Sequence, residues 1–129
     1  MDAYFANIEE LTENNTNFRK VLFTGKHCQL VVMSLKAGEE IGAEVHDHVD
    51  QFFRIEEGEA KIVADGKETM VKDGDAFVIP AGCDHNVINT STEEDLKLYT
   101  IYSPPNHPDK TVHQTKAEAD AAEEEEHKA

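Results

Sequence analysis

The sequence predicts an all-β domain, a sandwich or barrel built from many short strands. From Phe18 to Tyr102, short apolar runs are broken by turn residues at the spacing of roughly 8 to 12 residues that is typical of such folds. Asp65-Gly66 separates two of these runs and marks a tight hairpin, because glycine accepts a positive φ without steric cost. The chain has 129 residues, enough for one domain of normal size, and shows no alternation of strand and helix patterns.

Nine strands are expected in order along the chain. Their ranges are Phe18–Phe23, Cys28–Leu35, Ile41–His46, Gln51–Glu56, Ala60–Ala64, Thr69–Lys72, Ala76–Ile79, His85–Asn89 and Leu96–Tyr102. A second turn is expected at Asp73-Gly74, between the sixth and seventh strands. The run Leu30–Met33 is apolar on both faces, so one of its faces is available to a partner subunit.

The two ends of the chain differ from this central pattern. The expected regions are an acidic N-terminal arm or short helix at 1–17, the β domain at 18–103, and a Pro-rich exit with an acidic tail at 104–129. Thr115 and Glu118 have the spacing of a capping box, which predicts a helix in the tail with a frayed or disordered end. His107 and His113 are expected to be solvent-exposed.

Charge excludes two classes of partner. The 12 basic and 27 acidic residues give a net charge of −15, which disfavours nucleic acid and anionic membranes. No apolar run approaches the roughly 20 residues of a membrane-spanning helix. The first five residues lack the basic and apolar regions of a signal peptide, so we expect a cytoplasmic protein. Cys28 and Cys83 are then expected to be free thiols.

The most specific segment combines a turn, an apolar strand, a Pro-Gly bend and a histidine that opens the next strand. A single histidine in such a place is ordinarily structural. Here, however, five residues fit the pattern G-x5-P-x-G-x2-H-x3-N, which is the second motif of the cupin superfamily. These residues are Gly74, Pro80, Gly82, His85 and Asn89. Between Phe18 and Tyr102 the chain therefore resembles a small single-domain cupin.

The first cupin motif, G-x5-H-x-H-x3,4-E-x6-G, fits in two ways. In the first alignment every gap is preserved, with Glu44 in the place of the first histidine and Gln51 in the place of the glutamate. In the second, His46 and His48 form the histidine pair and the following gap is one residue short. Side chains alternate along a strand, so Glu44, His46 and, in a regular strand, His48 share one face. The preserved gaps favour the first alignment.

The resemblance implies a double-stranded β-helix, the RmlC-like jelly-roll barrel, with its site inside one mouth and a homodimeric assembly. The wider pattern is similar to small bacterial cupins labelled by analogy to phosphomannose isomerase, which describes a domain type and not a reaction.

Histidine and carboxylate groups in this pattern point to a divalent transition metal, Fe, Mn, Ni or Zn. The candidate ligands are Glu44, His46, His48, Gln51 and His85. Phe53, Cys83 and Tyr99 are candidate pocket residues; core packing is the alternative for Tyr99 and for Tyr102. A neutral glutamine binds a cation less strongly than glutamate, so weak binding or no metal is the alternative.

Three functions remain open at this point. The first is a metal-binding cupin acting on a small organic molecule as a dioxygenase, isomerase or decarboxylase. The second is a metal-free module that binds or senses a sugar-like ligand, which Gln51 favours. The third is a structural dimer without an active pocket. If Glu44 is not a ligand, it is a candidate general base beside a metal-held substrate.

Overall fold

Two antiparallel sheets and two short helices make up the computed structural model, which describes the backbone of residues 2–128 and the side chains of residues 2–124. The elements in order are α1 Ile8–Asn14, β1 Arg19–Thr24, β2 Gln29–Leu35, β3 Asp50–Glu57, β4 Glu59–Ala64, β5 Lys67–Lys72, β6 Ala76–Ile79, β7 His85–Asn89, β8 Leu96–Ser103, β9 Val112–His113 and α2 Lys116–Lys128. Eight of the nine expected strands are confirmed, with ends that shift by at most two residues.

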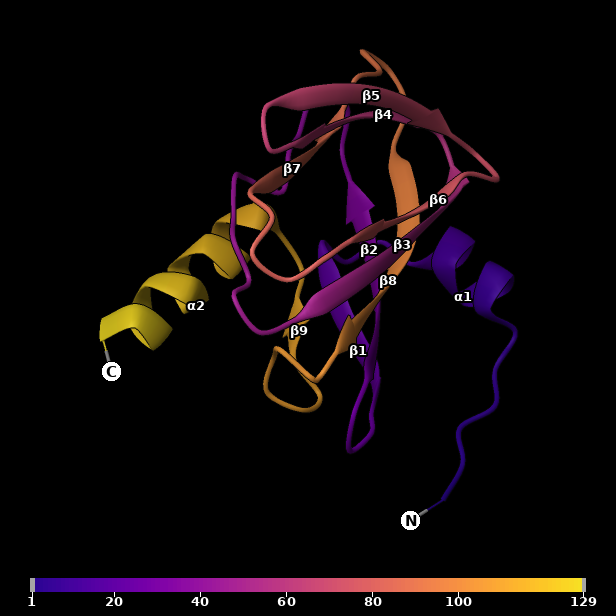
Figure 1. The fold of residues 1–129 in the computed structure, drawn as a ribbon. Coiled ribbons are helices and arrows are strands. Elements are labelled where there is room, and N and C mark those ends of the chain that lie inside the picture. The colour runs from indigo at the N-terminus through magenta and orange to yellow at the C-terminus, as the bar shows by residue number, and fades with distance from the viewer. Residues whose placement is uncertain (1, 129) are drawn as a thin grey trace.

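The two sheets pack face to face around the core. The larger has the strand order β6-β3-β8-β2-β1-β9 and the smaller has the order β5-β4-β7 (Figure 1). Apolar side chains from both sheets fill the space between them, among them Val31, Met33, Phe53, Ile55, Ala60, Ile62, Val87 and Leu98. The fold is a jelly roll, as expected, but its sheets are not joined into a closed barrel.

Strand periodicity decides which polar side chains enter the interior. In β3, Gln51, Phe53 and Ile55 are buried while the residues between them are partly exposed. Leu98 and Tyr102 of the neighbouring β8 are buried on the same inner face. One polar residue, Gln51, is therefore carried into the interior at the end of β3 by the same alternation that builds the core.

The hairpin between β4 and β5 has the turn that its sequence predicts. Asp65 and Gly66 have φ angles of 47° and 82°, and β4 pairs with β5 without a shift of register. Two consecutive positive φ angles characterise the tight turn whose twist matches that of the flanking strands.

The strand predicted over Ile41–His46 is wrong. This segment runs along the free edge of β7 but makes only two isolated bridges, Glu40 with Ile88 and Glu44 with His85. Between the two bridges this segment advances by four residues while β7 advances by three, so the segment contains one extra residue. Gly42 lies in this stretch with a φ of 107°, and the segment bulges there and interrupts the ladder.

The Pro-rich exit returns to the large sheet. β8 ends at Ser103, as expected where prolines remove backbone donors, but the chain then forms the unpredicted strand β9 beside β1. The buried Gln29 side chain fixes this return: its Oε1 accepts from the backbone N–H groups of Asn106 and His107, and its Nε2 donates to the carbonyl of His107. The sheet thus continues into the region expected to be only exit and tail.

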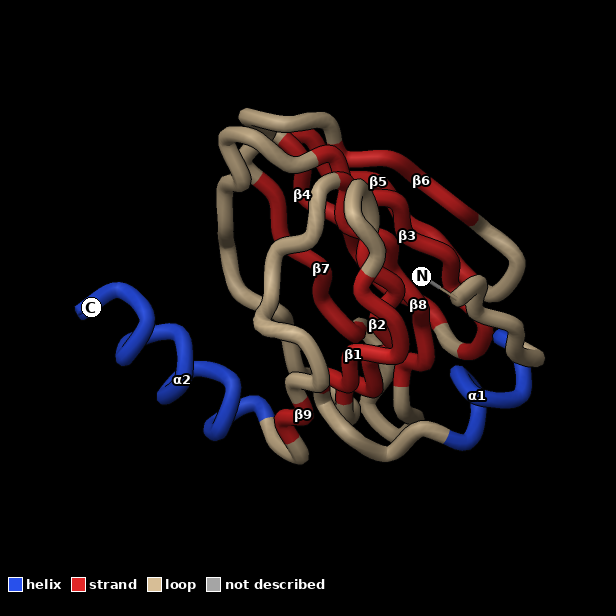
Figure 2. Tube along the Cα trace, turned by 90° about the horizontal axis from the view of Figure 1, so that it is seen from below, coloured by secondary structure: helices blue, strands red, loops and turns tan. Residues whose placement is uncertain are grey.

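The two helices lie at opposite sides of the sheets (Figures 1 and 2). α2 is confirmed with its predicted cap, since Glu118 N–H donates to Thr115 Oγ1 and the Glu118 carboxylate accepts from Gln114 N–H. The predicted fraying of its end stays a prediction. Neither described helix is long and apolar enough to span a membrane. Both cysteines are free thiols, as expected.

The segment after α1 covers the outer face of β2. Lys97 Nζ donates to the Asn15 carbonyl at 2.6 Å and to Ser34 Oγ at 2.9 Å, and Val32 is only 1% exposed. The chain's own N-terminal segment therefore covers part of the surface expected to meet a partner, and the homodimer stays a prediction.

We predict that Gln29→Ala lowers the free energy of unfolding by about 1–3 kcal/mol, because buried backbone groups of the exit segment lose their partner. Urea denaturation measures this loss. Gln114→Ala is the matched control, since the Gln114 side chain is exposed. Equal stability of the two variants would contradict the role assigned to Gln29.

Candidate metal centre and its cavity

Two backbone hydrogen bonds bring the halves of the site together. Glu44 N–H donates to the His85 carbonyl at 2.9 Å, and His85 N–H donates to the Glu44 carbonyl at 3.0 Å. Residues paired in this way project their side chains from the same side of the sheet. His46 lies two residues after Glu44, and its carbonyl accepts from Gly82 N–H at 2.9 Å, so the Pro-Gly bend also holds this histidine.

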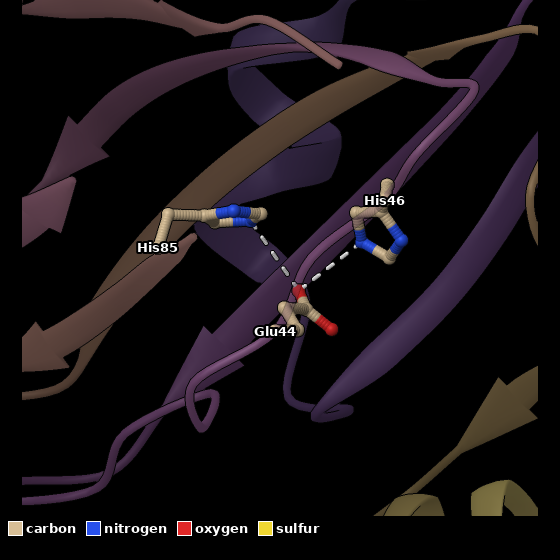
Figure 3. A group of neighbouring side chains, drawn as sticks. All are labelled: Glu44, His46 and His85. Carbon is tan, nitrogen blue, oxygen red and sulfur yellow. Dashed lines mark ion pairs between the residues drawn. The ribbon is translucent and has the colours of Figure 1, made fainter. Parts of the chain in front are cut away.

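Glu44, His46 and His85 converge on one point. Their potential ligand atoms all lie within 4.8 Å of one another. Glu44 Oε1 is 3.4 Å from His46 Nε2 and 3.6 Å from His85 Nε2, so the carboxylate lies between the two rings (Figure 3). The first alignment, in which every gap is preserved, likewise places Glu44 together with His46.

The spacing of these atoms fits a shared metal ion better than direct hydrogen bonds. Charge-assisted N–H···O bonds are about 2.7–2.9 Å long, whereas donors about 2.1 Å from one tetrahedral ion lie about 3.4 Å apart. Both histidine Nε2 atoms are buried and make no hydrogen bond. His85 Nδ1 lies 3.0 Å from the Cys83 carbonyl, which can only accept. In the neutral ring the proton is therefore on Nδ1, and the Nε2 lone pair faces Glu44.

The carboxylate and the imidazoles of the group shift one another's pKa values. Burial alone would raise the pKa of Glu44, but the neighbouring His46 and His85 imidazoles outweigh burial and lower it from 4.5 to about 2. Burial would likewise lower the pKa of His85, yet Glu44 and the Cys83 carbonyl raise it above 6.5. Without a cation, the carboxylate is thus stabilised by protonated imidazole, and a metal ion would replace those protons.

Gln51 of β3 presents an unpaired amide oxygen inside the protein. The residue is 1% exposed, and its Nε2 donates to Thr100 Oγ1, which in turn donates to the Phe52 carbonyl. This chain fixes the amide plane. Oε1 is buried without a hydrogen-bond partner, as expected for a group that binds something other than protein.

A cavity of about 440 Å³ opens beside the group and includes Glu44 and His46 in its walls. Its walls also include the returning chain, with His107 and His113, both of which are partly buried. The expectation that these two histidines are solvent-exposed is therefore wrong. His107 Nε2 lies 3.2 Å from the hydroxyl of Tyr102, whose ring meets His46 edge-on at 6.0 Å.

The other candidates have different positions. His48 is exposed in a turn and outside the group, because the bulged segment is not a regular strand. Phe53 stacks on Phe77 at 4.7 Å and touches the edge of His85, so it supports the site from within the core. Cys83 contributes its backbone carbonyl, which lies 3.0 Å from His85 Nδ1. Tyr99 contacts Phe52 and, unlike Tyr102, is absent from the buried inner face of β8.

Arg19 is a charged cavity residue that the sequence did not indicate. It lies 7% exposed on β1, paired in register with His113 of β9. Strand alternation could have selected Tyr102 over Tyr99. No local pattern marks Arg19, His107 or His113, because they meet only after the exit segment folds back.

Fold and site together define a jelly-roll protein with a buried carboxylate–imidazole group suited to a metal ion. Residues 31–102 match the Cupin domain family, and the chain belongs to that family. This confirms the resemblance seen in the two motifs.

The relatives are consistent with this family. An uncharacterized protein, YrkC of Bacillus subtilis (strain 168), is 53% identical over 127 residues, covering 93% of this chain and 67% of YrkC. The crystal structure of BH2720 from Bacillus halodurans superposes with a TM-score of 0.91 at 46% identity, covering 93% of this chain and 95% of that one. A protein from Thermotoga maritima described as a predicted oxalate decarboxylase superposes with a TM-score of 0.58 at 25% identity, covering 62% of this chain and 69% of that one.

We predict that the stability of the metal-free protein depends on pH through this group. The Glu44 contribution is present above pH 4.5 and is lost as pH falls towards 2, because the folded pKa is the lower one. The His85 contribution is present below pH 6.5 and is lost as pH rises through its raised folded pKa. Glu44→Gln removes the partner on which both depend and flattens both slopes.

Urea unfolding in the presence of a chelator, repeated across pH, measures these slopes. Glu59→Gln is the control, since it removes the same charge from an exposed position on β4. A Glu44→Gln protein with the pH profile of the wild type would contradict the coupling.

Proposed function

We propose that this protein is a metal-binding cupin that acts on a small organic molecule. The observation that carries the proposal is the buried Glu44–His46–His85 group, whose Nε2 atoms lack hydrogen-bond partners, at the wall of a 440 Å³ cavity. Isolated buried imidazoles and carboxylates are costly unless they bind one another or a cation. The family, shown by the match over residues 31–102, supports a cupin-type role with a small molecule.

The proposed ligands are Glu44, His46 and His85, with Gln51 Oε1 as a fourth. Two imidazoles and oxygen donors suit Fe, Mn, Ni or Zn. Such an ion, when bound, polarises a substrate oxygen or activates water or dioxygen. The residues that would hold the ion come from three places in the chain: Gln51 from β3, His85 from β7, and Glu44 and His46 from the bulged segment between β2 and β3.

Glu44 fits a ligand better than a general base. A base is most effective when its pKa lies near the working pH, and the pKa of Glu44 is about 2. Its carboxylate is also oriented by two imidazoles and by the backbone pairing with His85. We therefore favour the ligand role over the alternative that Glu44 removes a substrate proton.

The reaction is proposed as oxygenation, isomerisation or decarboxylation. The similarity to the Thermotoga maritima protein described as a predicted oxalate decarboxylase supports keeping decarboxylation among the three. A homodimeric assembly and a cytoplasmic location complete the proposal, as the sequence suggests.

The second candidate is metal-free binding of a small polar ligand. Gln51 favours it, because a neutral amide replaces the carboxylate of the family motif. The attraction between Glu44 and the two imidazoles also stabilises the group without an ion. In this case the unpaired Gln51 Oε1 would accept a hydrogen bond from the ligand.

We predict about one metal ion per chain in the wild-type protein and little in His85→Ala, because the variant loses one of the two imidazoles of the proposed ligand set. Elemental analysis of untagged protein incubated with Fe, Mn, Ni or Zn checks this. His48→Ala is the matched control and keeps its metal, since His48 is exposed outside the group. A wild-type protein that takes up no metal would contradict the proposal. Ligand screening in the presence of a chelator would then test the second candidate.

We predict that Gln51→Glu binds the metal roughly tenfold or more tightly, because a charged donor replaces a neutral one. The same change lowers the stability of the metal-free protein by about 1–3 kcal/mol, since it places a carboxylate at a position that is 1% exposed. Metal titration and thermal unfolding with and without metal measure the two effects. Unchanged metal affinity would remove Gln51 from the ligand set.

A further inference from the structure

The cavity contains a buried cation that the proposed metal centre does not use. Arg19 on β1 is 7% exposed and lines the cavity together with Glu44 and His46. Buried arginines are normally paired with a carboxylate or phosphate. Among the residues that the structure describes, no acidic side chain forms an ion pair with Arg19.

The protein holds this guanidinium in place but leaves part of it unsatisfied. Arg19 Nη1 lies 3.4 Å from His113 Nδ1, which accepts from it, and the guanidinium carbon lies 5.4 Å from the centre of the Phe18 ring. Nε is buried and has no hydrogen-bond partner. A positioned cation with unused donors, inside a cavity, is suited to bind an anion.

Among the described residues that line the cavity, Arg19 is the only arginine or lysine. Burial lowers the pKa of His107 to about 3, so this ring is neutral near pH 7. Burial raises the pKa of Tyr102 to about 12, so its hydroxyl remains protonated. Besides Glu44, the described acidic residue that lines the cavity is Glu123 of α2, and its side chain is exposed. A single guanidinium with a planar fork of donors matches one carboxylate in charge and in geometry.

We propose that Arg19 binds a carboxylate of a small organic acid whose other end reaches the Glu44–His46–His85 group. The inference rests on the proposed function for the second contact and specifies its substrate class. Arg19 and the metal centre lie in the walls of one cavity, so a substrate held at both ends would be fixed in orientation before reaction.

The test compares two probes that differ by one charge. Succinate offers a carboxylate at each end, whereas succinamate keeps one carboxylate and replaces the other with a neutral amide. Calorimetric titration of the nickel-loaded protein at physiological salt gives both affinities. We expect the wild type to bind succinate about ten- to a hundredfold more tightly, the range for loss of a charged hydrogen-bond partner.

Arg19→Gln removes this preference while nickel affinity stays at the wild-type value. Lys20→Gln is the matched control: it removes the same charge from the next residue of β1, which is exposed, and keeps the preference. Arg19→Lys retains the positive charge but loses the planar fork of donors, and it restores part of the preference for succinate. If Arg19→Gln does not fold, the wild-type preference and the Arg19→Lys result still decide the matter.

Equal affinities for the two probes in the wild type, or an unchanged preference in a folded Arg19→Gln protein, would overturn the proposal. Tighter binding of inorganic phosphate than of succinate to the metal-free protein would overturn the carboxylate assignment. Nickel binding without any succinate preference leaves the metal centre intact and rejects only this inference. Arg19-dependent binding of succinate in a protein that takes up no metal rejects the metal centre and retains the carboxylate site.

Discussion

The site depends on one pair of backbone hydrogen bonds, those between Glu44 and His85. The two residues are far apart in sequence, and the pairing places their side chains within 3.6 Å of each other. Gly42, at its positive φ, takes up the extra residue that this register requires. If the segment formed a regular strand, a different set of side chains would face β7. The bulge is therefore the structural reason why Glu44 meets His85, whereas His48 is excluded because the chain turns at Asp47 and His48.

The core supports this pairing but also imposes a cost on it. Phe53 packs against Phe77 and the edge of His85, so the histidine ring is held by rigid apolar neighbours. The same burial removes water from both Nε2 atoms and from Gln51 Oε1. A folded protein stabilises such groups by pairing them or by binding something else, and the Glu44 carboxylate only partly satisfies two imidazoles. Two unpaired imidazole nitrogens that converge on one carboxylate indicate a binding site more strongly than the motif letters alone.

The returning C-terminal segment turns an open end of the sheets into a cavity. Gln29 ties the exit segment to β2, and β9 then pairs with β1 beside Arg19. This return brings His107 and His113 into the walls of the cavity that Glu44 and His46 also line. The cavity thus combines a carboxylate–imidazole group and a guanidinium, within a protein of net charge −15.

The sequence by itself determined the all-β class, eight of the nine expected strands, the Asp65-Gly66 hairpin and the His85 half of the site. These features are local: alternation, turn residues and fixed motif spacing act over a few residues. The sequence left two alignments open for the first motif, since both put His46 on the same face. Only the tertiary structure decided between Glu44 and His48, because the pairing with β7 fixes the register. It also placed Arg19 and His107 in the cavity, since their proximity depends on contacts between distant segments, which no short-range pattern encodes.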